Sequence, residues 1–193
     1  MPTHFVALFS DVTHALRHQQ EVERLAYRDS LTRLPNRRLL GDRLRQALSS
    51  AERHRTHVAV CYVDLDGFKP INDAYGHEMG DEVLREVARR LDDVIRASDT
   101  AARVGGDEFV LVLTDLAVED EAIPVLSRAS EALARPFHVA GGQVVRLSAS
   151  IGVAFFPRDG ADADALLRHA DQAMYEAKRE LREGMRRFQA SDA

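Results

Sequence analysis

The sequence predicts an α/β fold, in which helices and short strands alternate along one chain. Three long segments, residues 36–54, 81–97 and 162–187, carry apolar residues at helical spacing. Between them lie short apolar runs bounded by glycine, proline or acidic residues, a pattern typical of strands. At 193 residues the chain is long enough for one domain with a sizeable core and a short appendage.

The strands are marked by short apolar runs. His57–Val63 is apolar over most of its length, which predicts a buried central strand with Asp64 at its carboxyl end. Thr100–Val104 and Phe109–Thr114 are predicted as two further strands, and the two glycines between them give the backbone freedom of a tight hairpin. A strand-rich segment, residues 143–156, follows later in the chain.

Prolines interrupt two of the segments between the strands. Residues 117–134 are predicted to be helical, with Pro124 in or near the first turn, where proline is tolerated. The stretch that contains Pro70 and runs through Tyr75 is expected to be broken rather than helical.

Charge and cysteine content narrow the class of protein. A net charge of −5 and a pI of about 5.9 argue against a nucleic-acid-binding surface. The single cysteine, Cys61, lies in an apolar strand and is expected to be a core residue. The sequence contains neither a signal peptide nor an apolar run of membrane-spanning length, so we expect a cytoplasmic location for this piece. A full-length protein could still be tethered to a membrane.

The N-terminal residues have a character of their own. Residues 3–10 read as a strand that begins abruptly, and residues 14–27 read as a polar helix. This order resembles the end of a PAS sensory domain running into its output helix. We therefore expect residues 1–28 to be the end of an upstream PAS domain with a signalling helix or linker. The helix either packs on its own domain or forms a short coiled coil, and its weak apolar stripe favours neither.

Three carboxylates are candidates for chemistry. Asp107 and Glu108 follow Gly105-Gly106 at the predicted hairpin tip, and Asp64 ends the central strand. Taken singly, each fits a solvated turn or a helix cap. Brought together in space, they would form the hard oxygen set that Mg²⁺ uses beside substrate phosphates.

Several motifs together make the chain resemble a GGDEF domain, the catalytic domain of bacterial diguanylate cyclases. The similarity runs from about residue 29 to residue 188, so we expect a GGDEF domain over residues 29–193. It implies a central, mostly antiparallel sheet flanked by helices, palm-like as in nucleotide cyclases. The motifs, in chain order, are Asp29–Arg38, Asp64–Asp81, Gly105–Phe109, Ser150–Ala154 and Ala170–Lys178.

The resemblance implies the condensation of two GTP molecules into cyclic di-GMP and two pyrophosphates by a homodimer. In the family's pattern Asp64, Asp107, Glu108 and the backbone carbonyl of Leu65 hold two Mg²⁺ ions per site, with Mn²⁺ as an alternative. Asp107 is also the family's candidate for accepting the 3′-hydroxyl proton. A different nucleotide cyclase on the same fold is a weaker interpretation, because the motif and the guanine-binding residues both fit.

The same resemblance assigns the substrate contacts. Asn72 and Asp81 are implied to read guanine, since a carboxylate can accept the adjacent N1–H and N2–H₂ donors that adenine lacks. The alternative for Asp81 is the N-cap of the helix that follows. The residues implied to contact the triphosphate are Phe68, Lys69, Lys178 and Arg182.

Arg96 and Asp99 match the RxxD motif at which the family's product binds and inhibits synthesis. The motif stands five residues before Gly105, the distance that the family keeps. The alternative is a surface salt bridge between two residues at helical spacing.

One departure from the family concerns the residues after Lys178. The family usually continues with Gly-Arg-Asn, whereas here Leu181 and Glu183 flank Arg182. A helix that runs through Leu181 could displace Arg182. This keeps open an alternative function, a GTP- or cyclic di-GMP-binding regulatory module for a fused EAL-type phosphodiesterase domain.

Overall fold

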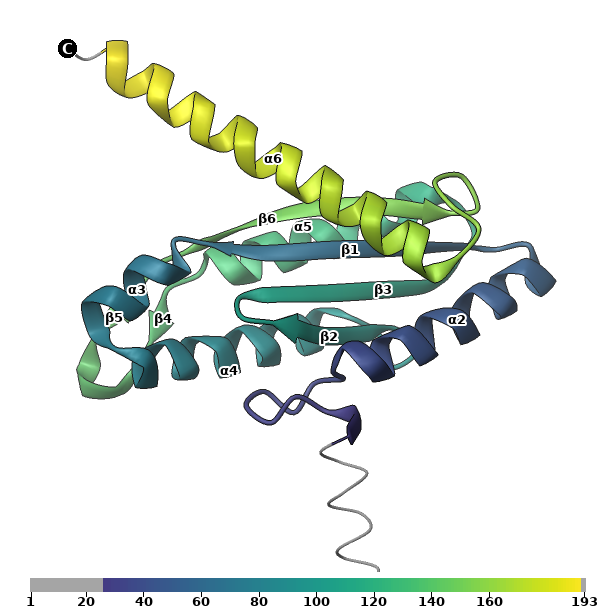
Figure 1. Cartoon of the computed structure of the whole chain (residues 1–193), viewed down its shortest axis with the longest axis horizontal. Coiled ribbons are helices and arrows are strands. Elements are labelled where there is room, and N and C mark those ends of the chain that lie inside the picture. Colours follow the sequence, from purple (N-terminus) through teal and green to yellow (C-terminus); the bar gives the residue numbers. More distant parts are fainter. Residues whose placement is uncertain (1–25, 192–193) are drawn as a thin grey trace, which may run out of the picture.

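A computed structural model describes residues 26–191, with side chains for residues 26–139 and 141–180. Four strands form a central sheet in the order β2-β3-β1-β6, and each neighbouring pair is antiparallel (Figure 1). The predicted α/β fold with an antiparallel sheet flanked by helices is confirmed. The strands are β1 (His57–Asp66), β2 (Thr100–Gly105), β3 (Glu108–Leu116) and β6 (Ser148–Phe156).

Helices cover both faces of this sheet. The helices α2 (Arg37–His54) and α6 (Ala163–Ser191) pack on one face, and α4 (His77–Val94) and α5 (Ala122–Ala134) pack on the other. Successive β1 side chains point to opposite faces of the sheet. Val60 and Tyr62 therefore pack in the core beneath α2 and α6, and Cys61 packs in the core beneath α4 and α5. β1 is buried along nearly its whole length because it is central and covered twice.

The segment expected to be broken is helical. It forms α3 (Phe68–Tyr75), and Pro70 is its third residue, where the missing N–H disrupts no intrahelical bond. The next helix, α4, begins at His77 rather than at residue 81, because Gly76 adopts φ 83° and separates the two helices. Asp81 therefore lies inside α4, and the interpretation of Asp81 as its N-cap is wrong.

The remaining elements connect the layers. A short 3-10 turn, η1 (Glu119–Glu121), precedes α5, which starts five residues later than expected and has Pro124 as its third residue. A two-stranded sheet of β4 (Phe137–His138) and β5 (Val144–Val145) encloses the 3-10 turn η2 (Ala140–Gly142).

Two expectations concern the ends of the chain. The strand and most of the helix expected over residues 1–28 lie outside the described residues. At the other end, α6 runs without a break through position 181, as the helical pattern predicted. None of the helices among the described residues is long and apolar enough to cross a bilayer.

Candidate active site

Strand register brings the three predicted carboxylates to one end of the sheet. Asp64 of β1 lies directly opposite Glu108 of β3. Asp107 occupies the turn before β3, and its carbonyl accepts a hydrogen bond from the Leu65 N–H at 3.3 Å. Residues far apart in the sequence thus meet because β1 and β3 are central neighbours.

The turn between β2 and β3 is stabilised by an arginine, Arg103, that the sequence analysis did not single out. Gly106 has φ 49°, a left-handed conformation that suits glycine. The Arg103 guanidinium donates two hydrogen bonds to the Gly106 carbonyl, at 3.0 and 2.8 Å. Arg103 also forms an ion pair with Asp29 at 2.9 Å. The first motif of the chain is therefore tied directly to the turn that carries Asp107.

Lys178 of α6 contacts the Asp64 carboxylate as a hydrogen bond and ion pair. Burial raises the pKa of Asp64, the charges of Asp107 and Asp66 act in the same direction, and Lys178 opposes them. A cation therefore already lies on the carboxylate that is predicted to bind metal.

Close packing of α6 on the sheet gives Lys178 this position. A Cβ at Gly152 of β6 would lie 2.0 Å from the Met174 nitrogen and 2.2 Å from the Ala170 oxygen. Only glycine permits this approach of helix to strand. Lys178 is one helical turn beyond Met174 and so lies over the end of β1.

Glu108 also has a protein partner. The Tyr62 hydroxyl donates a hydrogen bond to Glu108 Oε2 at 3.1 Å. Burial, together with the negative charge of Glu108, raises the pKa of Tyr62 to about 12, so the phenol remains a donor near neutral pH. The sequence analysis missed Tyr62, and only its alternation with Asp64 along the strand could have indicated that both face the same side.

Asp66 has a structural role. Its carboxylate accepts hydrogen bonds from the Ser150 hydroxyl at 2.9 Å and the Ser148 hydroxyl at 3.1 Å. These contacts fasten the end of β1 to β6.

Phe68 and Lys69 are the first two residues of α3. Backbone N–H groups in the first turn of a helix have no intrahelical acceptors and favour anions. Gly67 has φ 81° and leads the chain from β1 into this turn without a side-chain cap. The two N–H groups remain available to phosphate oxygens.

Asn72 of α3 lies against Gly80 of α4, the residue before Asp81. A Cβ at Gly80 would be 1.9 Å from Asn72 Oδ1, so Gly80 allows the two helices to approach. Asn72 Oδ1 is buried and has no hydrogen-bond partner among the described residues. Asp81 is half-exposed and lies 3.9 Å from Arg85. An acceptor without a partner among the described residues and a half-exposed carboxylate both suit a ligand edge that carries donors, as guanine does.

The donor set fits a magnesium ion, although no complete metal cage is formed. In the described part of the chain, no three His, Cys, Asp or Glu side chains are grouped closely enough to hold a metal by themselves. Mg²⁺ is usually held by one or two carboxylates together with substrate phosphates, so an incomplete protein set is expected. The oxygen-only chemistry of Asp64, Asp107 and Glu108 and the cation already on Asp64 agree with this arrangement.

Arg96 and Asp99 lie in the turn after α4. Asp99 is buried, and its carboxylate accepts hydrogen bonds from the backbone N–H groups of Arg96 at 3.1 Å and Thr114 at 3.0 Å. Within the described residues no ion pair joins the two side chains, so the alternative of a helical surface salt bridge is not what the structure shows. Asp99 holds the turn, and the Arg96 guanidinium has no protein partner in this part of the chain.

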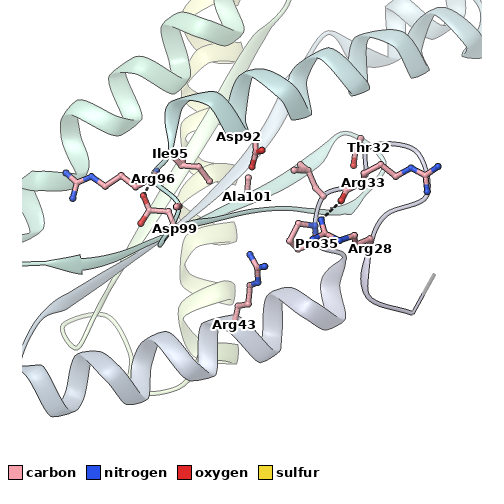
Figure 2. A pocket seen from close by; sticks show the side chains of 12 residues that line it. Arg28, Thr32, Arg33, Pro35, Arg43, Asp92, Ile95, Arg96, Asp99 and Ala101 are labelled. Atoms are coloured by element: carbon pink, nitrogen blue, oxygen red, sulfur yellow. Dashed lines mark hydrogen bonds between the residues drawn. The ribbon is translucent and has the colours of Figure 1, made fainter. Parts of the chain in front are cut away.

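A pocket of about 450 Å³ adjoins this turn. Figure 2 shows Arg43 of α2 pointing into it, with Arg33 and Arg96 at opposite edges. Arg28 lines it as well, and Asp92 stands above Arg43 in this view. The pocket is thus rich in arginine.

Comparison with known proteins identifies the family. Residues 26–184 match the family described as diguanylate cyclase, GGDEF domain. The chain belongs to the GGDEF domain family.

The chain is similar to several Pseudomonas aeruginosa proteins. It is 45% identical over 179 residues to the bifunctional diguanylate cyclase/cyclic di-GMP phosphodiesterase MucR, covering 93% of this chain and 26% of MucR. It is 40% identical over 186 residues to the diguanylate cyclase TpbB, covering 96% of this chain and 41% of TpbB. The chain therefore spans less than half the length of either relative.

Solved structures share the fold. The GGDEF domain of TpbB superposes with a TM-score of 0.78 at 42% identity, over 80% of this chain and 90% of that domain. The coiled coil and GGDEF domain of DgcB from Caulobacter crescentus, in complex with c-di-GMP, also gives 0.78, at 29% identity over 88% of this chain and 90% of that one.

Proposed function

We propose that this chain is a diguanylate cyclase that condenses two GTP molecules into cyclic di-GMP. In each half-reaction the 3′-hydroxyl oxygen of one GTP attacks the α-phosphorus of the other. A new P–O bond forms, the bond to the β-phosphate oxygen breaks, and pyrophosphate leaves while the hydroxyl proton is released. The observation that carries the proposal is the register of Asp64 opposite Glu108, with Asp107 in the adjoining turn.

Asp64, Asp107, Glu108 and the Leu65 carbonyl would hold Mg²⁺, with Mn²⁺ as an alternative. When bound, the metal would stabilise the attacking oxygen and the charge that develops on pyrophosphate. Lys178 now lies on Asp64, and a bound metal would free its ammonium to contact a phosphate oxygen. Its compact charge suits that contact.

The other substrate contacts follow from the helix ends. The N–H groups of Phe68 and Lys69 would hold phosphate oxygens, and Arg182 on α6 would add a contact. Its side chain lies outside the described part. Guanine N–H groups would meet Asp81 and the unpartnered Asn72 Oδ1. Adenine, which lacks the N1–H donor, would leave Asp81 unpaired at a free-energy cost.

Two chains are required by this chemistry, because each domain holds one GTP and the two must face each other. We propose that the product returns to Arg96 and Asp99 and inhibits synthesis. The free Arg96 guanidinium and the arginine-lined pocket support this, since guanidinium groups bind phosphates well. The structure of DgcB is of a complex with c-di-GMP. The assignment of residues 1–28 to the end of an upstream PAS domain with its signalling helix or linker remains a prediction, as does a downstream EAL domain in the full-length protein.

A regulatory module is the second candidate. The continuous course of α6 through position 181 favours it, because the family's usual glycine would end or bend the helix there. MucR, to which this chain is similar, is named as both a diguanylate cyclase and a cyclic di-GMP phosphodiesterase, so the two activities are combined in a relative.

Turnover separates the two candidates. The purified chain is incubated with GTP and Mg²⁺ at several protein concentrations, and cyclic di-GMP is measured by chromatography. A cyclase assembled from two domains gives a specific rate that rises with protein concentration. Absence of product from both the free chain and an enforced dimer, combined with measurable GTP or cyclic di-GMP binding, would favour the regulatory module.

A further inference from the structure

We propose that Tyr62 is a positioning residue for Glu108: its hydroxyl fixes one carboxylate oxygen and leaves the other to the metal. This inference rests on the proposed function, because it assigns a role in the same metal site. It concerns a residue outside the sequence motifs discussed above.

The sheet geometry makes this contact specific. Tyr62 lies opposite Val110 on β3, and Glu108 is two residues before Val110, on the same face of the sheet. The phenol therefore reaches Glu108 diagonally across the β1–β3 pair, where its oxygen lies 3.1 Å from Oε2. Both residues belong to regular central strands, so the contact does not depend on loop conformation.

Burial restricts the orientation of the Tyr62 side chain, which is the donor. Tyr62 is only 8% exposed and belongs to the core between the sheet and α6. A buried phenol needs an acceptor, and the Glu108 carboxylate is the acceptor that the described structure provides. The ring is held by packing while its hydroxyl holds the ligand.

The chemistry matches the outer shell of a metal site. Ligating carboxylates are commonly oriented by a hydrogen bond to a second residue, and losing that residue typically costs about 10- to 100-fold in metal affinity or activity. Asp64 has Lys178 as its partner, and Glu108 has Tyr62. Without the phenol, Glu108 would sample other rotamers and lose part of its affinity for the ion.

The test measures metal binding directly. Mn²⁺ is titrated into the purified chain in the presence of 3′-deoxy-GTP, which lacks the attacking hydroxyl, and free Mn²⁺ is followed by electron paramagnetic resonance. We expect Tyr62→Phe to weaken Mn²⁺ binding about 10- to 100-fold. Tyr175→Phe is the matched control, because Tyr175 is 63% exposed on α6, and it should bind Mn²⁺ as the wild type does.

Repeating the Tyr62→Phe substitution in a Glu108→Gln variant distinguishes a positioning role of Tyr62 from general damage to the fold. In Glu108→Gln, the further change Tyr62→Phe should have little additional effect on Mn²⁺ affinity, because Tyr62 acts through Glu108. An equal loss in both backgrounds would overturn the inference and indicate general damage to the fold. If Tyr62→Phe bound Mn²⁺ as tightly as the wild type does, the role of Tyr62 would be overturned while the proposed function would stand. Absence of Mn²⁺ binding by the wild-type chain would overturn both.

Discussion

The carboxylate end of the sheet and the arginine pocket differ in how they are built. At the carboxylate end, Asp64 and Glu108 stand on adjacent central strands and each already has a protein partner. The pocket is lined by arginines from a loop, a helix and a turn, and the Arg96 guanidinium has no partner among the described residues. One site is fixed by strand register, whereas the other is assembled from chain segments at the sheet's periphery.

This difference indicates opposite ligands. The carboxylates suit a cation, because a metal ion can replace the Lys178 ammonium on Asp64, while the neutral Tyr62 phenol leaves one oxygen of Glu108 for the metal. Several guanidinium groups around a pocket suit an anion with several oxygens, and within the described residues the Arg28 and Arg43 guanidinium groups each donate one hydrogen bond, to a neutral oxygen. We therefore propose that metal-bound GTP occupies the first site and that the phosphates of cyclic di-GMP occupy the second.

The largest effect is expected at the carboxylate end. Asp107→Asn removes a charge from the proposed metal site without changing the size of the side chain. Turnover should fall by more than the roughly 100-fold that is typical of losing a residue that only orients a ligand. Chromatographic product assays provide the measurement, with Asp120→Asn, an exposed acid of η1, as control. Unchanged turnover in Asp107→Asn would remove the assignment.

Arg96→Ala should act on the pocket alone. A hydrogen bond to a charged group contributes about 1.5–3 kcal/mol, so we expect product inhibition to weaken about 10- to 100-fold while the initial rate stays constant. The inhibition curve for added cyclic di-GMP is the measurement. Arg45→Ala is the control, because Arg45 is exposed and its ion pair within the described residues is with Asp42, away from the pocket.

Asp99→Ala is a poorer probe of the pocket than Arg96→Ala. Asp99 accepts hydrogen bonds from two backbone N–H groups, so its removal also takes the acceptor from these two part-buried donors and loosens the turn itself. If Arg96→Ala left the inhibition curve unaltered, the pocket would lose its proposed ligand.

Gly152→Ala should separate α6 from the sheet. The added Cβ would meet the backbone of Met174 and Ala170, and overpacking of this kind typically costs about 1–3 kcal/mol. Urea unfolding gives the free energy of unfolding, and binding of 3′-deoxy-GTP should weaken in parallel because Lys178 moves with the helix.

Gly41→Ala is the matched change in α2. The nearest atom is the end of the flexible Arg45 side chain, at 3.4 Å, so alanine should stabilise the helix by about 0.5–1 kcal/mol. Equal effects of the two substitutions would contradict the packing argument.

The smallest effect is expected at the ion pair between Asp29 and Arg103, which lies between the carboxylate end and the arginine pocket. Burial alone would raise the pKa of Asp29, but hydrogen bonds from Thr32 and the Arg103 ion pair lower it below its usual value of 3.8. A depressed folded-state pKa means that the stabilisation is complete above the unfolded-state pKa and is lost as pH falls through the folded-state pKa. The difference in unfolding free energy between wild type and Asp29→Asn should therefore be constant above about pH 5 and shrink below pH 3.8. A difference that stays constant down to pH 3 would exclude this ion pair as its source.

The sequence predicted the strands well, because their signals are local, and the three carboxylates that it singled out meet at one end of the sheet. His57–Val63 and the Gly105-Gly106 turn each carry their own pattern, and β1 was found within three residues of its end. The start of α4 was predicted too late, because Gly76 rather than an acidic cap begins the helix. Whether Arg182 contacts substrate stays a prediction.

The supporting contacts could not be predicted in the same way. Tyr62, Arg103 and Gly152 act through residues 46, 74 and 22 positions away, and no local pattern encodes such contacts. Strand register and helix docking decide them. The sequence therefore indicated the charged residues of the site, whereas the fold was needed to identify the residues that position them.

Calorimetric titration of two ligands, with Mg²⁺ and then with a chelator, tests the contrast between the regions most directly. We expect 3′-deoxy-GTP to bind only when Mg²⁺ is present, whereas cyclic di-GMP should bind in both conditions and lose affinity in Arg96→Ala. Binding of 3′-deoxy-GTP that is equally tight without metal would contradict the assignment of the carboxylates to a metal site, because they would then have no cation to share with the triphosphate.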